Sequence, residues 1–298
     1  MLMLQRGDII IGKWTNRRYI ILKKVGQGGI GVVFKVKDEE GNIRAIKVSD
    51  DISSITREYN IMNELQKLDC LPKVYQIDDT IIHNKTFYFF VMDYIRGENL
   101  KEIIKYGKLS IKDILSIAYI VVNFFKRVKE AGYSYYDIKL ENIVIDKYKK
   151  KLLFIDFGGA VEGNLSMKEY TPTYSPEAWG IEVNKGYDDR IIFSGTMLIV
   201  NMLLEKEVNP FTCSITNLVN DKLIKLKLNK IVEKFVEKGL YIKYENVNIY
   251  LDELKDILIR LNTSNLKIER NYDIIDIVFI CSIGLFVLTL IITVNYFI

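Results

Sequence analysis

Histidine and cysteine are scarce in this sequence, which has one histidine and three cysteines among 298 residues. Cys70, Cys213 and Cys281 stand far apart, without metal-ligand spacing or a pairing pattern, which suits a reducing cytosol. One histidine without partners forms neither a metal site nor a nucleophilic triad. This scarcity argues against zinc enzymes and triad hydrolases. His83, in a polar turn between two apolar runs, is predicted to be an exposed loop residue.

A secretory signal, internal repeats and low-complexity segments are also missing. The apolar run Met1–Leu4 is too short for a signal peptide, and Arg6 and Asp8 end it. The formal net charge is only +4, and 49% of the residues are hydrophobic. A chain of this length and composition can bury a sizeable core, as one two-lobed domain or two small ones.

Lysine is concentrated in two clusters. The first comprises Lys147, Lys149, Lys150 and Lys151, and the second comprises Lys222, Lys225, Lys227, Lys230 and Lys234. Apolar residues recur at helical spacing through the second cluster, at Ile224, Leu228, Ile231 and Phe235. These lysines are therefore predicted to lie on the wet side of a helix. Two interpretations stay open, a solvated helix face or a contact with anionic lipid or nucleic acid.

The sequence ends in a long uncharged run. Residues 277–298 contain no charged residue and are rich in Ile, Leu, Val and Phe. A helix of this length reaches about 33 Å, enough for a hydrocarbon core of about 30 Å. We predict a transmembrane helix over 277–298 after a juxtamembrane linker over 262–276. A buried core helix is the weaker alternative, because core helices of this length usually keep a polar face.

A small β-rich half precedes a larger helical half. Apolar, β-branched runs predict strands, over Tyr19–Lys24, Val32–Lys37, Arg44–Val48, Lys73–Ile77 and Thr86–Met92. A helix is predicted over Ile55–Leu68, with Ser53 or Ser54 as its N-cap. Past Gly97 the pattern is mainly helical, apart from an apolar hairpin near 143–155. The expected fold class is α+β, in two lobes.

A glycine-rich turn joins the first two strands. Its sequence Gly26-Gln27-Gly28-Gly29-Ile30-Gly31 fits G-x-G-x-x-G, which is a weak signal alone because dinucleotide-binding folds share it. Here a strand follows, so the turn is predicted to be a hairpin lid whose backbone N–H groups approach phosphates. The candidate nucleotide-binding residues of this hairpin are Val25, Gly26, Gly28, Gly29, Gly31 and Val33.

A lysine on the third strand provides a second phosphate contact. Lys47, two residues after the candidate nucleotide-binding residue Ala45, can reach the α- and β-phosphates. The next helix offers Glu58 and Glu64 as carboxylate partners. Glu58 shares a face with the apolar positions three, four and seven residues on, whereas Glu64 points about 110° away. Glu58 is therefore the predicted partner of Lys47.

The strand that ends near Met92 breaks into a glycine-bearing connector, Asp93–Gly97. This segment is typical of a hinge, where backbone groups near Asp93 and Ile95 would hydrogen-bond adenine. An ordinary strand end is the alternative, and the neighbouring motifs favour the hinge.

The strongest constellation is a polar loop over 135–142, followed by Asp156-Phe157-Gly158. Phosphoryl transfer needs mainly positioning and neutralisation of oxygen charge. Asp137 would orient the acceptor hydroxyl and take its proton, and Lys139 would neutralise the γ-phosphate. Asn142 and Asp156 would hold Mg²⁺ between the phosphates of ATP.

These motifs resemble the eukaryotic-like protein kinases, over a domain that we place at 16–261. Lysine two residues after the catalytic aspartate is similar to the serine/threonine branch, which implies protein substrates with Ser or Thr acceptors. The stretch Tyr170–Glu177 resembles the end of a kinase activation segment. The resemblance implies that Thr171 bonds Asp137 and Lys139, and that Glu177 anchors this segment.

Within the family, the sequence looks most like the compact YabT-type kinases of endospore-forming bacteria. The resemblance lies in Gly12-Lys13-Trp14, in Ala45–Asp51 and in the apolar tail. It implies a single-pass protein of the cell membrane with a cytoplasmic kinase domain. Self-association and phosphorylation between copies are expected from confinement at the membrane.

The sequence departs from the family pattern in three places. Tyr135-Tyr136 replaces the usual His-Arg before Asp137, only 11 residues separate Lys47 from Glu58, and the aspartate expected to brace the catalytic loop is uncertain. Asp189 is the candidate for that brace. Because of these departures, two alternatives to an active serine/threonine kinase stay open. One is a pseudokinase that binds ATP or serves as a scaffold, and the other is a small-molecule kinase.

Overall fold

The computed structural model describes residues 4–29, 31–107, 109–163 and 171–263. The chain divides into two compact units. The first contains the described parts of 1–97, 128–136 and 153–167. The second contains the described parts of 98–127, 137–152 and 168–298, so each unit is assembled from segments far apart in the sequence.

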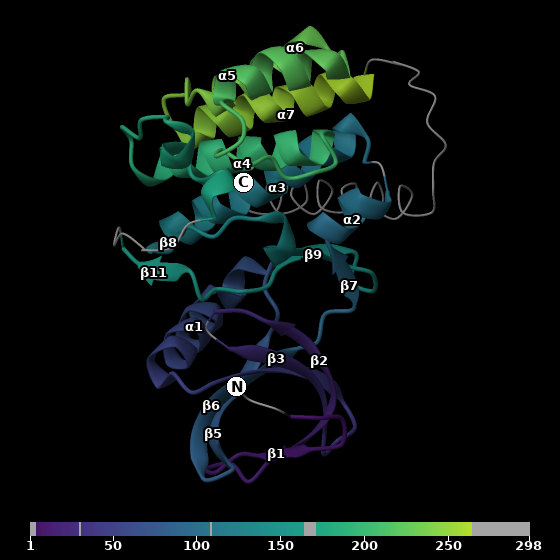
Figure 1. Cartoon of the computed structure of the whole chain (residues 1–298), viewed down its shortest axis with the longest axis vertical. Coiled ribbons are helices and arrows are strands. Elements are labelled where there is room, and N and C mark those ends of the chain that lie inside the picture. The colour runs from purple at the N-terminus through teal and green to yellow at the C-terminus, as the bar shows by residue number, and fades with distance from the viewer. Residues whose placement is uncertain (1–3, 30, 108, 164–170, 264–298) are drawn as a thin grey trace, which may run out of the picture. The chain divides into compact units, whose positions relative to one another are not determined.

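An antiparallel sheet forms most of the first unit (Figure 1). Its strand order is β1-β2-β3-β4-β6-β5. The strands are β1 (Ile9–Ile11), β2 (Arg18–Gln27), β3 (Val32–Asp38), β4 (Ile43–Ser49), β5 (Val74–Ile82) and β6 (Lys85–Asp93). The five predicted strands correspond to β2–β6. β1 was not predicted and lies ahead of the predicted domain boundary at residue 16. A run of three isoleucines is too short to predict a strand from sequence.

Alternation along the strands separates two faces of this sheet. Phe34 on β3 and Ile46 on β4 are cross-strand partners, and both belong to the buried core of the first unit. Val33 and Lys47 are the next partners along the same ladder. Since successive side chains point to opposite faces, Val33 and Lys47 lie on the face away from that core. The same alternation places Ala45 beside them.

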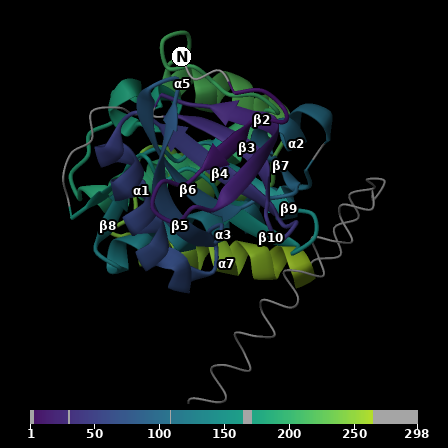
Figure 2. The same cartoon turned by 90° about the horizontal axis from the view of Figure 1, so that it is seen from below.

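Helix α1 (Ile52–Glu64) packs against β4, β5 and β6, and Figure 2 shows it beside the sheet. Its N-cap is Asp51, whose carboxylate accepts hydrogen bonds from the backbone N–H groups of Ser53 and Ser54. The prediction of a serine cap was therefore wrong. A short 3₁₀ turn, Leu65–Leu68, follows α1, so the predicted helix over 55–68 is two elements.

Short strands and helices make up the rest of the described chain. The strands β7 (Gly97–Asn99), β9 (Ile143–Asp146) and β10 (Lys151–Phe154) form one small sheet, and β8 (Tyr133–Tyr135) pairs with β11 (Ala160–Glu162). The helices are α2 (Leu100–Tyr106), α3 (Ile111–Glu130), α4 (Tyr187–Leu203), α5 (Ile215–Asn217), α6 (Lys230–Leu240) and α7 (Val247–Thr263). This distribution agrees with the predicted α+β class.

Helix α4 lies at the centre of the second unit and packs against α6 and α7 (Figure 1). Two glycines allow close contacts of α4, one with α3 and one with α6. A Cβ on Gly195 would lie 2.3 Å from Cγ2 of Val122 in α3, and a Cβ on Gly239 of α6 would lie 2.2 Å from Oγ1 of Thr196. Larger residues at either position would force the helices apart.

The second lysine cluster does not lie on one continuous helix, so that prediction was wrong. A π-helix over Leu218–Leu223 passes into a 3₁₀ turn over Ile224–Leu226, and Lys227 has a left-handed backbone with φ of 49°. α6 then starts anew after the cap Asn229, whose side chain accepts from the N–H of Ile231. Ile224 and Ile231 are consequently exposed, whereas Phe235 is buried.

The predicted transmembrane helix over 277–298 and all but the first two residues of the predicted linker lie outside the described residues. Within 4–29, 31–107, 109–163 and 171–263, no helix combines the length and apolarity needed to cross a membrane. His83, as predicted, is exposed in the turn between β5 and β6.

Candidate active site

In the first unit, the side chain of Lys47 contacts two carboxylates. Its Nζ lies 2.6 Å from Oε2 of Glu58 and 3.0 Å from Oδ1 of Asp156. Glu58 is 1% exposed and comes from the buried face of α1, as its helical spacing predicted. Glu64, the other candidate partner of Lys47, instead accepts a hydrogen bond from the hydroxyl of Tyr133.

Burial and the neighbouring negative charges have opposite effects on the pKa of Lys47. Desolvation alone would lower the pKa of its ammonium group, but the negative charges of Glu58 and Asp156 outweigh it and raise that pKa. Lys47 is therefore a fixed positive charge at neutral pH. A cation held by carboxylates in this way can stabilise phosphate oxygens without moving far.

The segment that carries Asp156 is held on several sides. Asp156 has a φ of 127°, a conformation that non-glycine residues rarely adopt and that the surroundings must stabilise. The hydroxyl of Tyr135 donates to the carbonyl of Asp156 at 2.8 Å, and the N–H of Phe157 donates to Glu58 at 3.3 Å. The rings of Tyr135 and Phe157 pack with centroids 5.1 Å apart.

Arg57 of α1 adds a contact that the sequence did not reveal. Its guanidinium donates to the carbonyl of Gly158 at 3.3 Å. A single arginine beside Glu58 matched no motif, and only the folded position of α1 shows which backbone carbonyl it meets. Arg57 and Glu58 thus connect α1 to the Asp156-Phe157-Gly158 segment.

The glycine-rich turn joins β2 to β3, with the N–H of Gly28 donating to the carbonyl of Gly31 at 2.9 Å. Gly31 is required by packing, because a Cβ there would lie 2.5 Å from the carbonyl oxygen of Val48. At Gly26, Gly28 and Gly29, in contrast, a Cβ would meet no atom of the described residues within 4 Å. The protein's own packing does not demand glycine at these three positions, which suits backbone exposed to a ligand.

The other predicted nucleotide contacts also lie in the first unit. Val25 is exposed on β2, and Val33, Ala45 and Lys47 share one face of the sheet. Asp93 ends β6, with its N–H donating to the carbonyl of Lys73 and its carboxylate paired with Arg44. Ile95 lies beyond β6 in irregular backbone, as expected for a hinge.

In the second unit, three side chains converge on the carboxylate of Asp137. Lys139 Nζ lies 2.5 Å from Oδ2, the amide of Asn142 donates to the same oxygen at 3.2 Å, and the hydroxyl of Thr171 donates to Oδ1 at 2.8 Å. These donors hold the carboxylate of Asp137 in one orientation. The expected contact of Thr171 with Asp137 is present.

The chain after Thr171 is fixed to α4. The carbonyl of Tyr174 accepts from Ser194 at 2.8 Å, and Glu177 forms an ion pair with Arg190 and accepts from Ser175. Burial tends to raise the pKa of Glu177, but the hydrogen bonds from Ser175 and Arg190 lower it overall. The sequence did not identify Arg190, since no local spacing marks it as the partner of Glu177.

Asp189, the candidate brace of the catalytic loop, contacts the backbone just ahead of its own helix. Its carboxylate is buried and accepts from the backbone N–H groups of Asn184 and Lys185, at 2.8 and 2.7 Å. Asp189 therefore stabilises the loop that leads into α4.

The donor atoms fit the metal that the motifs imply. Asn142 and Asp156 offer an amide oxygen and a carboxylate, the hard ligands that Mg²⁺ prefers. The amide nitrogen of Asn142 donates to the backbone carbonyl and to the carboxylate of Asp137. The side chain of Asp156 is 40% exposed and accessible to a bound ion.

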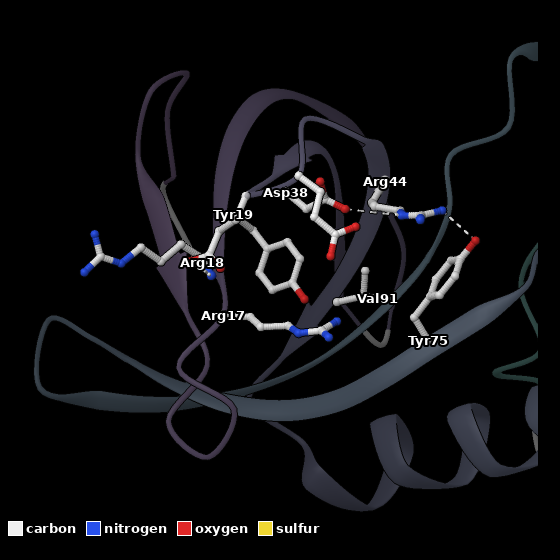
Figure 3. Close-up of a pocket in the computed structure, with 9 residues that line it drawn as sticks. Arg17, Arg18, Tyr19, Asp38, Arg44, Tyr75 and Val91 are labelled. Carbon is white, nitrogen blue, oxygen red and sulfur yellow. Dashed lines mark hydrogen bonds and ion pairs between the residues drawn. The ribbon is translucent and has the colours of Figure 1, made fainter.

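A pocket of about 260 Å³ in the first unit lies apart from these residues (Figure 3). Arg44 lines it between Asp38 and Tyr75, and Tyr19 and Val91 of the core lie beside it. Because Arg44 alternates with Ala45 along β4, the pocket opens on the opposite face from Lys47. None of the predicted site residues lines this pocket.

Comparison with known proteins agrees with this geometry. The family model described as the protein kinase domain matches residues 19–267. Serine/threonine-protein kinase YabT of Bacillus subtilis is 28% identical over 258 residues, which cover 85% of this chain and 74% of YabT. A probable serine/threonine-protein kinase of Clostridium acetobutylicum is 26% identical, over 83% of this chain and 41% of that protein.

A solved structure shows the same fold. The Cydia pomonella granulovirus kinase PK-1 superimposes with a TM-score of 0.62 at 19% sequence identity. The match covers 79% of this chain and 92% of the viral kinase.

Proposed function

Because this chain belongs to the protein kinase family, we propose that it transfers the γ-phosphate of Mg²⁺-bound ATP to serine or threonine hydroxyls of proteins. The observation that carries the proposal is the pair of half-sites. One presents Lys47 with Glu58 and Asp156, and the other presents Asp137 with Lys139, Asn142 and Thr171. The bacterial relatives are named serine/threonine-protein kinases, which supports serine and threonine as acceptors.

Each residue has a role that its contacts support. Asp137 orients the acceptor hydroxyl and takes its proton, while Thr171 fixes the orientation of that carboxylate. Lys139 neutralises the transferring phosphoryl group, and Lys47 neutralises the α- and β-phosphates. Asn142 and Asp156 would hold the Mg²⁺, which supplies further neutralisation of phosphate charge when bound. Positioning and charge account for most of the catalysis of such a transfer.

A pseudokinase would keep the fold and lack the transfer. The test is calorimetric titration of the full-length protein with ATP, once in the presence of Mg²⁺ and once in the presence of EDTA. An autophosphorylation assay follows. We expect Mg²⁺-dependent binding and incorporation of phosphate on serine or threonine. Binding without incorporation would favour the scaffold, and labelling of a small molecule alone would favour a small-molecule kinase.

Activity is expected to depend little on phosphate in the activation segment. Tyr136 stands where the family usually has an arginine, so the ordinary charge-assisted partner of such a phosphate is missing. Ser166, Thr171 and Thr173 are candidate sites of autophosphorylation, but activity should not require a phosphate on this segment. Phosphatase treatment should change the activity by less than tenfold. A larger drop would show that another basic residue replaces the arginine.

The proposal includes attachment to the cell membrane by residues 277–298, as a single-pass protein. Lys267 and Arg270 precede this uncharged run, so the positive-inside rule would place the kinase domain in the cytoplasm. ATP and Mg²⁺ are available there. Confinement at a surface raises the effective concentration of neighbouring copies, which favours self-association and phosphorylation in trans.

Membrane attachment predicts a clear result in fractionation. Full-length protein should pellet with membranes and be digested by protease added to the cytoplasmic side. A chain that ends at Arg270 should stay in the supernatant, because it lacks the uncharged run. Full-length protein in the supernatant, or a kinase domain protected from cytoplasmic protease, would contradict this arrangement.

A further inference from the structure

The N-terminal hairpin, formed by β1 and the start of β2, exposes apolar side chains on its outer face. Ile10 and Ile21 point into the core, whereas Ile9, Ile11 and Ile20 are 51%, 45% and 42% exposed. Ile9 and Ile20 are direct cross-strand partners, so their side chains adjoin. The tip of the hairpin carries Trp14, which is 73% exposed. We call Ile9, Ile11, Trp14 and Ile20 the hairpin face.

The tip that presents Trp14 is rigid. Asp78 of β5 accepts from the N–H groups of Trp14 and Thr15, at 3.1 and 3.0 Å, and from the Thr15 hydroxyl at 2.6 Å. Gly12 permits this approach, since a Cβ there would lie 2.2 Å from Oδ2 of Asp78. The backbone of the loop is thus fixed before any partner arrives, which lowers the ordering cost of binding.

Basic residues outnumber acidic ones along the hairpin itself, while Asp78 and Asp79 of β5 contact its tip. Residues 5–24 contain one acidic residue, Asp8, and six basic ones, Arg6, Lys13, Arg17, Arg18, Lys23 and Lys24. The Lys13 ammonium lies 5.1 Å from the centre of the Trp14 ring. Figure 3 shows the side chain of Arg18 pointing away from the other residues that line the pocket. A partner of this face therefore meets isoleucines, one indole and the basic side chains of the same hairpin.

We propose that the hairpin face binds the surface of an anionic lipid bilayer. Basic side chains attract anionic headgroups, tryptophan favours the membrane interface, and isoleucine gains from contact with acyl chains. Nucleic acid would use the charges and the indole but not three isoleucines. A second copy would need a longer strand to pair with, because β1 has only three residues at the sheet edge.

Together with the proposed C-terminal anchor, such a contact would orient the kinase domain on the membrane. A kinase attached to a membrane at one point samples many orientations, whereas a second contact through the hairpin face selects one of them. Two modest membrane contacts on one chain also reinforce each other. This part of the argument rests on the proposed anchorage, but the binding of the hairpin face does not depend on catalysis.

Tryptophan fluorescence tests the proposal in the full-length protein, combined with or reconstituted into vesicles of phosphatidylcholine with or without phosphatidylglycerol. The chain has two tryptophans, and Trp179 is buried, so Trp14 supplies the environment-sensitive signal. Anionic vesicles should shift the emission of Trp14 to the blue and protect it from acrylamide. Brominated lipids should quench it, and Trp14→Phe should remove the response.

Matched variants separate this face from net charge alone. Arg6→Gln with Arg18→Gln should abolish the shift, as should Ile9→Ser with Ile11→Ser. Lys225→Gln with Lys230→Gln removes the same charge from the second lysine cluster and should leave the shift intact. Asp137→Asn should also leave it intact, so failure of catalysis and failure of lipid binding are distinguishable.

Several results would overturn the proposal. Equal acrylamide quenching of Trp14 in neutral and anionic vesicles would exclude the lipid contact. Loss of the shift only in the Lys225 and Lys230 variant would place lipid binding at the lysine cluster. A shift produced by a DNA or RNA oligonucleotide without vesicles would identify nucleic acid as the partner. Protection that grows with protein concentration and needs no lipid would identify a second copy.

Discussion

Replacing Asp137 with asparagine is expected to lower the rate of phosphate transfer by about 100-fold or more, the usual scale for a positioned general base. Asparagine preserves the shape of the side chain but cannot accept the proton of the acceptor hydroxyl. It also loses the charge that attracts Lys139, whose ammonium lies 2.5 Å from the Asp137 carboxylate. The measurement is the initial rate of autophosphorylation and of transfer to a generic acceptor protein.

Asp221→Asn is the matched control, because it removes a carboxylate at an exposed position in the second unit. It should retain the wild-type rate. Near-wild-type transfer by the Asp137→Asn variant would show that Asp137 is not the base, whatever its hydrogen bonds.

Replacing Lys47 with methionine is expected to cause a loss of similar size, about 100- to 1,000-fold, as for removal of one preorganised donor from a transition state. Methionine has comparable length and no charge. The change also removes the cation that pairs with the buried carboxylate of Glu58. Since an unpaired buried charge is costly, Glu58 should then take up a proton rather than unfold the domain.

The rate and the thermal midpoint should be measured together for this variant. Lys23→Met, at an exposed position on β2, controls for the loss of one positive charge. A second variant, Lys47→Met with Glu58→Gln, removes the unpaired carboxylate and should regain stability without regaining activity. Recovery of transfer in the double variant would mean that Lys47 acts only through the stability of the fold.

Local sequence patterns predicted the parts of the fold that depend on periodicity. Apolar, β-branched runs predicted strands β2 to β6. The helical spacing of apolar residues around Glu58 predicted that its side chain points inward. Sequence patterns failed to predict features that depend on contacts with residues distant in the sequence. β1 exists because Ile10 joins a core formed by later strands, and Asp51 replaces serine as the cap of α1 because Ser49 and the strand end orient it.

The candidate site shows the same division. Motif spacing selected Lys47, Asp137, Asn142 and Asp156 as candidates, because their residue types suit phosphate and metal chemistry. Arg57 and Arg190 went unnoticed because many arginines satisfy the same sequence conditions, and only packing selects the one that reaches a given oxygen. The helix predicted through the second lysine cluster ended at Lys227, where a left-handed residue interrupts an otherwise regular spacing.

Transfer from one copy to another tests the central claim most directly. Full-length wild-type protein is mixed with an excess of the full-length Asp137→Asn variant, Mg²⁺ and γ-labelled ATP, and the label on the variant is identified by acid hydrolysis. The proposed function predicts phosphoserine or phosphothreonine on the variant, dependent on Mg²⁺ and on the wild-type copy. Absence of label on both chains, with Mg²⁺–ATP bound to folded wild-type protein, would contradict it.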